Sequence, residues 1–174
     1  MFDYHNRRRA EEIVARYPQK RSALLPLLHL AQEQDGWVRP ESIKEIAELV
    51  GITPAEVLGT ASFYTMFKLR PVGRHVVSVC TNISCMLCGA EEVLSAFEEE
   101  FGTAADGLSE DGQIWLEEAE CLAGCGGAPC VQVDYEYFEG VTASKARDIA
   151  AALKRGTRPP GGKGLPADYQ DTRT

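Results

Sequence analysis

The sequence predicts an α+β protein in which a bundle of helices is followed by a domain built on a mixed, four-stranded sheet. In roughly the first seventy residues, apolar side chains recur at the three- and four-residue spacing of amphipathic helices. After Pro71-Val72-Gly73, short apolar runs bounded by glycines and polar clusters take over, which is typical of strands. We expect a helical bundle at 1–70, an α+β domain at 71–155 and a flexible Pro/Gly-rich tail at 156–174.

Four helices are expected in the first half, and local signals mark their ends. Ser22 is a candidate cap for the second helix, and Gly36 follows its last apolar residue. The residues Thr53 to Glu56 read T-P-A-E, a capping box with proline at the first helical position, and they start the fourth helix. The helices are expected at 6–17, 22–35, 40–50 and 54–64.

The second half is expected to run β-α-β-β-β-α. The run His75–Cys80 is short and largely apolar, and in the next strand Ile114 and Leu116 alternate with Trp115. The strands are expected at 75–80, 113–120, 130–135 and 137–141, with a loop at 102–112 and helices at 89–101 and after Thr142. This order matches a thioredoxin-like layer of helices on a sheet.

Composition and charge exclude several classes of function. The 174 residues carry a formal charge of -8, which argues against a nucleic-acid partner, since the phosphate backbone requires a basic face. No apolar run approaches the roughly 20 residues of a membrane span. The first residues lack the apolar stretch of a secretory signal. We therefore expect a cytosolic protein, where clustered cysteines favour metal or redox chemistry over disulfides.

The cysteines form two groups, and three kinds of site are open from their spacing. All six lie between Cys80 and Cys130, as C-x4-C-x2-C and then C-x3-C-x4-C. One interpretation is a zinc site of four thiolates. Another is a plant-type [2Fe–2S] site on Cys80, Cys85, Cys88 and a distant cysteine. The third is a [2Fe–2S] site on two pairs, Cys80/Cys85 and Cys121/Cys125.

Local structure favours the two pairs over the plant-type spacing. Cys88 is followed at once by the start of an expected helix, so it is poorly placed to wrap around a cluster. Gly124, Gly126 and Gly127 are expected to let main-chain N–H groups approach the sulfurs. The spacing alone does not choose between iron–sulfur and zinc. The acidic residues just before Cys121 either lower a cluster's reduction potential or form a solvated strand face.

Several longer segments carry a resemblance to a known family. They are V-L-G-T-A-S-F-Y-T-M-F at 57–67, P-V-G-R-H-V-V-S-V-C at 71–80, E-C-L-A-G-C-G-G-A-P at 120–129 and Y-F-E-G-V-T at 137–142. Together they resemble the 24 kDa or E-subunit family of NADH:quinone oxidoreductase (respiratory complex I), a thioredoxin-like [2Fe–2S] ferredoxin, nearly from end to end. The resemblance implies one [2Fe–2S] cluster, with the ligands Cys80, Cys85, Cys121 and Cys125.

The chain departs from that family at three places. Ala123 stands where the family usually has glycine, Cys88 and Cys130 stand where it commonly has other residues, and the match fades in the tail. One hypothesis is that Cys88 and Cys130 face each other near the cluster and form a disulfide on oxidation. Pro129 precedes a strand beside the site, as the cis-proline of thioredoxins does, so a cis bond there is a second hypothesis.

The resemblance also implies a function, that of an electron-transfer subunit. The cluster accepts single electrons from FMN in a partner flavoprotein subunit, which binds NADH, and the complex delivers electrons to quinone. Other expected partners are the remaining subunits of the peripheral arm, on the cytoplasmic side of the inner membrane. This chain has no G-x-G-x-x-G motif and no substrate site of its own.

Three alternatives to this assignment stay open. The first is the equivalent diaphorase subunit of an NAD-linked hydrogenase or formate dehydrogenase. The second is a free-standing thioredoxin-like ferredoxin, against which the long helical extension argues. The third is a zinc-held interaction module without a redox role.

Overall fold

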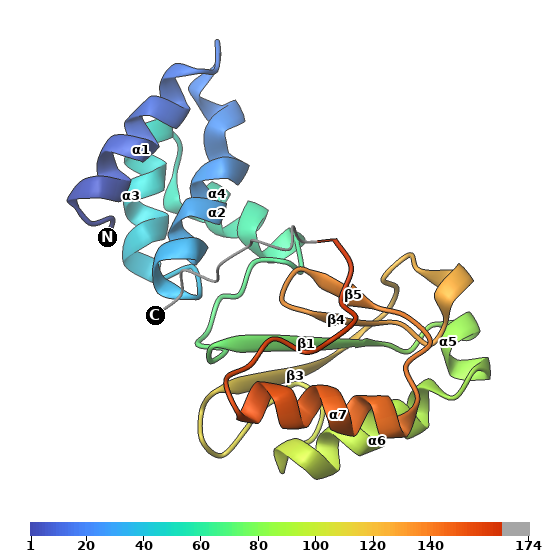
Figure 1. Ribbon diagram of the computed structural model, residues 1–174. Coiled ribbons are helices and arrows are strands. Elements are labelled where there is room, and N and C mark those ends of the chain that lie inside the picture. The colour runs from blue at the N-terminus through green and yellow to red at the C-terminus, as the bar shows by residue number, and fades with distance from the viewer. Residues whose placement is uncertain (165–174) are drawn as a thin grey trace. The chain divides into compact units, whose positions relative to one another are not determined.

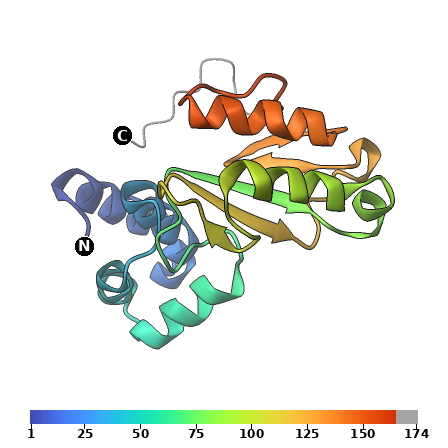
Figure 2. The ribbon, with the colours of Figure 1, turned by 90° about the horizontal axis from the view of Figure 1, so that it is seen from below.

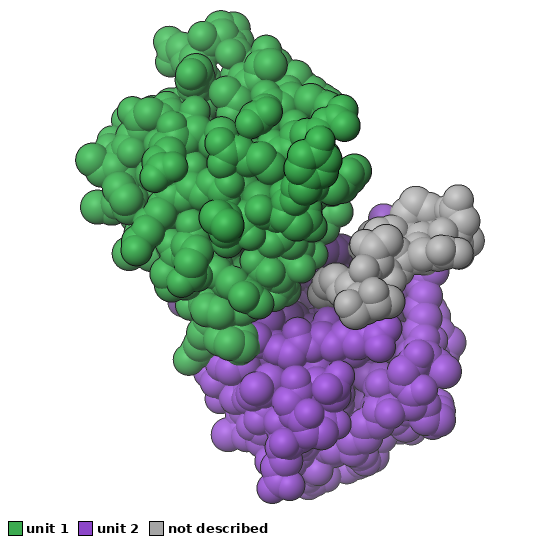
Figure 3. Space-filling view, turned by 90° about the vertical axis from the view of Figure 1, so that its left-hand side faces the viewer, with its two compact units in different colours: residues 1–71, 173–174 green, residues 72–172 purple. Residues whose placement is uncertain are grey.

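A computed structural model describes residues 1–164 of the chain (Figure 1). The chain divides into two compact units, one of residues 1–71 and one that begins at Val72 (Figure 3). The division falls within the Pro71-Val72-Gly73 segment, where the sequence pattern changes from helical to strand spacing. Each unit has its own buried apolar core.

The first unit is a bundle of helices. Its elements are α1 (Tyr4–Ala15), the short 3-10 helix η1 (Lys20–Ala23), α2 (Leu24–Asp35), α3 (Pro40–Val50) and α4 (Pro54–Phe63). The core is formed where apolar faces of these helices meet, and Leu27, Leu28, Ile46 and Val57 are completely buried in it. The four expected helices are therefore present, with η1 as an addition.

The helix ends follow the local signals except at one place. Thr53 and Glu56 form the expected capping box, in which the Thr53 N–H group donates to Glu56 Oε2 at 3.0 Å and the Glu56 N–H group donates to Thr53 Oγ1 at 3.3 Å. Gly36 and Gly51 end α2 and α3 in the left-handed conformation, both with φ of 75°. The expected cap at Ser22 is wrong, because η1 runs directly into α2 and occupies that position.

The second unit holds a sheet with helices on it. Its elements are β1 (His75–Cys80), α5 (Ile83–Leu87), α6 (Ala90–Phe101), β2 (Gly107–Leu108), β3 (Ile114–Ala119), the 3-10 helix η2 (Cys125–Gly127), β4 (Val131–Val133), β5 (Glu136–Phe138) and α7 (Ala143–Lys154). The strand order is β2-β3-β1-β4-β5. Only the pair β1 and β3 is parallel; the other neighbours in the sheet are antiparallel.

The sheet has five strands, not the four that the sequence predicted. The additional strand is β2, which pairs Gly107 and Leu108 with Leu116 and Trp115 inside the segment expected to be a loop. Two residues are too few to show an alternating pattern, so this strand leaves no sign in the sequence. The five-residue helix α5 was missed for the same reason.

Helices α6 and α7 lie side by side on one face of the sheet (Figures 1 and 2). Beneath them lie Val77 and Val79 of β1, which pack with Phe97 of α6 and Ile149 of α7 in one buried cluster. Because side chains alternate along a strand, Ser78 of β1 points to the opposite face. The face of the sheet beneath the two helices is therefore mainly apolar, and polar groups are available on the opposite face.

The first part of the expected flexible tail is held against the sheet. Lys163 and Tyr137 of β5 exchange two main-chain hydrogen bonds, each of 2.8 Å. The Arg158 guanidinium binds the buried Glu136 carboxylate, with Nε 3.1 and 3.0 Å from its two oxygens. Charge pairing therefore anchors residues that composition alone predicts to be free. The rest of the tail, 165–174, lies outside the described residues.

Within residues 1–164, no single helix has both the length and the apolar character needed to cross a membrane. Among the helices of the described residues, only α3 and α4 taken together reach those values, as a pair bent by 114°.

Candidate metal centre

The parallel pair of strands brings the two cysteine groups to one edge of the sheet. β1 ends at Cys80, which lies opposite Ala119 at the end of β3. Cys121 follows two residues later. Because neighbouring parallel strands end at the same edge, the loops that leave β1 and β3 start side by side. The expectation of two cysteine loops at one edge of the sheet agrees with this register.

A short helix places the second cysteine of the first group. Asn82 caps α5 by accepting a hydrogen bond from the Ile83 N–H group at 2.8 Å. The turn of α5 directs Cys85 inward, where its side chain is buried beside Cys80 and Cys130. Cys88 lies after the last residue of α5 and is exposed. The structure thus separates Cys88 from the buried thiols, as the helix start after it suggested.

The second group lies in the loop between β3 and β4. Cys121 and Cys125 are both exposed there, and Cys125 opens η2. The Ala123 N–H group donates to the Cys121 sulfur at 3.3 Å. Ala123 makes this contact with φ of 57°, a left-handed conformation that glycine adopts more readily. This left-handed conformation explains why glycine would be favoured over alanine at position 123.

Main-chain N–H groups surround the Cys80 thiol. Burial by itself raises the pKa of Cys80, but the N–H groups of Leu122 and Asn82 oppose that effect. Hydrogen bonds from the thiols of Cys85 and Cys121 act in the same direction, and together these groups lower the pKa below its ordinary value. Contacts to Cys80 thus come from both cysteine groups, and they favour a thiolate there.

The other buried thiols have the opposite tendency. Burial raises the pKa of Cys85 to about 11, although the nearby N–H group of Cys130 partly opposes it. Burial also raises the pKa of the Cys130 thiol. In the absence of a metal, these two groups are therefore neutral thiols at neutral pH.

The structure brings two of the other candidate ligands to Cys80. The Cys80 side chain interacts with those of Cys85 and Cys121, and Cys125 lies in the same loop as Cys121. Among residues 1–164, no three histidine, cysteine, aspartate or glutamate side chains surround a single point as one metal ion requires. A two-iron cluster takes two thiolates at each iron, so its ligands come as two separate pairs. Paired thiols from two loops, with N–H groups near the sulfurs, fit the chemistry of that group.

Gly124 and Gly127 leave space for the side chains of neighbouring residues, which is a different role from the expected one of bringing N–H groups to the sulfurs. A Cβ atom at Gly124 would lie 2.7 Å from the Cys130 sulfur, and one at Gly127 would lie 2.6 Å from the Glu139 side chain. Nothing lies within 4 Å of a Cβ at Gly126. The N–H groups that act on the Cys80 and Cys121 sulfurs belong instead to Asn82, Leu122 and Ala123.

Sequence reasoning missed the place of Cys130. All six cysteines are free thiols. Cys130 is completely buried and its thiol donates to the Gly124 carbonyl oxygen at 2.9 Å, whereas Cys88 is exposed. One thiol is thus at the surface and the other in the interior, and the Cys88–Cys130 disulfide on oxidation stays a prediction. The peptide bond between Ala128 and Pro129 is cis, as the likeness to thioredoxins suggested.

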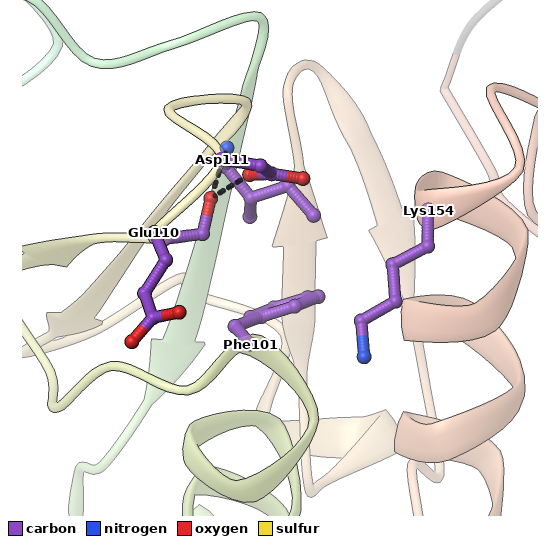
Figure 4. A pocket seen from close by; sticks show the side chains of 6 residues that line it. Phe101, Glu110, Asp111 and Lys154 are labelled. Carbon is purple, nitrogen blue, oxygen red and sulfur yellow. Dashed lines mark hydrogen bonds between the residues drawn. The ribbon is translucent and has the colours of Figure 1, made fainter.

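One further hollow lies at the opposite end of β3 (Figure 4). It has a volume of about 180 Å³ and is lined by Phe101, Ser109, Glu110, Asp111, Ile114 and Lys154. The Asp111 carboxylate accepts hydrogen bonds from the Ser109 hydroxyl at 2.6 Å and from the Gln113 N–H group at 3.0 Å. These bonds hold a turn, so the carboxylate already has a structural role.

Comparison with known proteins identifies the family. The family model for thioredoxin-like [2Fe-2S] ferredoxins matches residues 10–154. NADH-quinone oxidoreductase subunit 2 of Thermus thermophilus is 42% identical over 151 residues, covering 85% of this chain and 83% of its own length. The E-subunit of NADH-quinone oxidoreductase from Mycobacterium tuberculosis is 41% identical over 157 residues, covering 90% of this chain. The chain spans only 62% of that relative's length.

A solved structure supports the fold. An NAD+-reducing [NiFe]-hydrogenase in the air-oxidized state superposes on 76% of this chain, and on 23% of its own, with a TM-score of 0.67 at 18% sequence identity. Family membership also decides between the two metals that the cysteine spacing left open, in favour of iron and sulfide. The chain therefore belongs to the thioredoxin-like [2Fe–2S] ferredoxin family, and the cofactor of that family is one [2Fe–2S] cluster.

Proposed function

We propose that this chain is the electron-transfer subunit of an NADH:quinone oxidoreductase and accepts single electrons from FMN in a partner flavoprotein subunit. The observation that carries this proposal is its similarity to named subunits of that enzyme, at 41–42% identity over 85–90% of the chain. The cysteine arrangement supports it, because both groups meet at one edge of the sheet.

The proposed ligands are two pairs, Cys80 with Cys85 and Cys121 with Cys125. The first pair is buried at the end of β1 and in α5, and the second is exposed in the loop after β3. A bound [2Fe–2S] cluster supplies a one-electron redox centre. The exposed pair faces the outside of this unit, which suits electron exchange with another protein.

The N–H groups of the two loops have a defined task in this proposal. Those of Asn82 and Leu122 favour negative charge on the Cys80 sulfur, and that of Ala123 donates to the Cys121 sulfur. Such donors stabilise charge on thiolate ligands and thereby raise the reduction potential. The chain thus contributes rigid placement and electrostatic tuning.

The remaining parts of the machinery are assigned to partners. FMN and NADH belong on the flavoprotein subunit, since no G-x-G-x-x-G motif occurs in this sequence. Other subunits of the peripheral arm complete the complex on the cytoplasmic side of the inner membrane. The net charge of -8 supports a protein partner over nucleic acid.

A second candidate is the diaphorase subunit of an NAD-linked hydrogenase. The reason to consider this candidate is the structural similarity to an NAD+-reducing [NiFe]-hydrogenase, with a TM-score of 0.67. At 18% identity that match concerns the fold, whereas the NADH-quinone oxidoreductase subunits are more than twice as similar in sequence. We therefore place the respiratory complex first.

The decisive experiment isolates the tagged chain with its complex from the native host. We expect about one FMN per chain, an EPR signal of a reduced [2Fe–2S] cluster assigned to this chain, and quinone reduction by NADH. Nickel in the assembly, with hydrogen oxidation, would favour the hydrogenase. A chain that carries zinc, or that purifies alone with an intact cluster, would contradict the proposal.

A further inference from the structure

Cys130 touches both cysteine loops, although it is not a proposed ligand. Its carbonyl oxygen accepts a hydrogen bond from the Cys80 N–H group at 3.0 Å, at the end of β1. Its thiol donates to the Gly124 carbonyl oxygen at 2.9 Å, within the loop that carries Cys121 and Cys125. The residue is completely buried and packs against Cys85. One residue thus contacts the main chain of both loops.

We propose that Cys130 is a positioning residue for the cluster: it fixes the two ligand pairs relative to each other. This inference rests on the proposed ligand set. Its main-chain link to Cys80 exists for any residue at this position, because it belongs to the pairing of β1 with the start of β4. The link to the second loop depends on the side chain, and that part is specific to cysteine here.

The thiol holds the middle of the second loop. Gly124 lies between Cys121 and Cys125, so a bond to its carbonyl restrains both ligands. The same sulfur lies 3.4 Å from the Gly127 carbonyl oxygen, which also accepts from the Gly140 N–H group at 2.7 Å. The loop is therefore tied to the sheet at two carbonyl groups.

The fit between Cys130 and Gly124 leaves no space for another atom. A Cβ at Gly124 would lie 2.7 Å from the Cys130 sulfur, closer than real Cβ contacts. The backbone of Gly124 has φ of -101°, so a larger residue there is opposed by this contact and not by its conformation. A thiol that donates its hydrogen to a carbonyl is also not free to act as a thiolate ligand.

Two substitutions separate the bond from the packing. Cys130→Ala and Cys130→Ser leave similar volumes, but only serine retains a donor for the Gly124 carbonyl. The cluster-loaded chain is treated with an iron chelator, and loss of visible absorption gives the rate of cluster release. We expect Cys130→Ala to release the cluster about fivefold faster, the effect of one lost hydrogen bond. Cys130→Ser should restore most of the original rate.

The EPR spectrum and reduction potential of the same proteins provide a second readout. A displaced Cys125 should broaden the EPR signal of Cys130→Ala and shift its potential, whereas Cys130→Ser should resemble the parent. Cys88→Ala, at an exposed cysteine, is the matched control and should match the parent in all three measurements. Equal behaviour of Cys130→Ala and the parent, or equal damage by alanine and serine, would overturn the proposal.

A compensating pair tests the contact directly. Gly124→Ala should speed cluster release in the parent but much less in the Cys130→Ala protein, where the sulfur no longer opposes the new Cβ. An identical effect in both backgrounds would contradict the inference. The double variant Cys125→Ala/Cys130→Ala separates this result from the proposed ligand set, because the nearby Cys130 thiol cannot replace the missing ligand in it: a full cluster there refutes the ligands, whatever the single Cys130 variants do.

Discussion

The Ser78 hydroxyl donates a hydrogen bond of 2.8 Å to the Glu117 carboxylate, across the parallel strands that lead to the two cysteine loops. The other carboxylate oxygen accepts from the Trp115 indole N–H group at 3.0 Å. Glu117 is therefore a fixed charge on the face of the sheet opposite α6 and α7. The expectation of a solvated strand face does not describe it.

Glu117→Gln should raise the reduction potential of the cluster. Glu117 lies opposite Ser78, two residues and thus about 7 Å along the strand from Cys80. A negative charge at such a distance disfavours adding an electron, and its removal should raise the potential by roughly 20–70 mV. The measurement is an EPR-monitored redox titration.

Glu118→Gln is the matched control for that titration. Glu118 is the next residue of β3, but it points to the other face and is exposed. Water screens its charge more effectively, so its removal should shift the potential less. Equal shifts in the two variants would show that only net charge matters and not the placement of Glu117.

Cys125→Ala should lose the cluster or bind it at a small fraction of the parent's content, since one iron loses a thiolate. The measurement is iron and sulfide per chain. Because the Cys130 thiol lies close by, the substitution is repeated with Cys130→Ala to prevent replacement of the missing ligand. Cys88→Ala should keep full iron and sulfide; loss there would restore the plant-type spacing.

Ala123→Gly should stabilise the cluster-loaded chain. Ala123 has φ of 57°, where a side chain costs roughly 1 kcal/mol, and glycine removes that strain. We expect a gain of about 0.5–1 kcal/mol, seen as a higher midpoint of thermal unfolding. Ala128→Gly is the control, because Ala128 has an ordinary φ of -62° and glycine there should destabilise.

Protonation of Glu56 should weaken the helical unit in acid. The hydrogen bond from the Thr53 N–H group, followed by that from the Thr53 hydroxyl, lowers the pKa of Glu56 below 4.5. A lowered pKa gives stability that is present above pH 4.5 and is lost as the pH falls through the folded value. Thermal midpoints between about pH 6 and about pH 3 measure this loss.

Glu56→Gln provides the comparison for the acid titration. Glutamine still accepts the Thr53 hydrogen bonds but does not titrate, so its midpoint should depend less steeply on pH below 4.5. Parallel curves for the two proteins would assign the acid sensitivity to other carboxyl groups.

The sequence predicted correctly those helices and strands that are long enough to show a periodic pattern of apolar residues. Helix α3 has eleven residues, an apolar face and Gly51 after its last residue, and its bounds agree with those expected. The capping box at Thr53 was equally clear, since its residues are close in sequence. The five-residue α5 and the two-residue β2 are too short for periodicity and were missed.

The site was predictable only in outline. The meeting of Cys80 and Cys121 follows from the β1–β3 pairing, which sequence order and apolar runs suggest. The bond from Cys130 to Gly124 depends on how a loop folds back over β4, and no local pattern encodes that. Four cysteines as ligands therefore remain a prediction, whereas the family rests on similarity along residues 10–154.

The pairing of Lys163 with Tyr137 also affects the tendency of this chain to aggregate through the edges of its sheet. A strand at the border of a sheet offers free main-chain groups to which another molecule's strand can add. On β5, Tyr137 already uses its outward N–H and carbonyl groups on Lys163. The opposite border, β2, offers only two residues. Both borders are thereby protected against self-templated aggregation, and removal of residues 157–164 would be expected to open one of them.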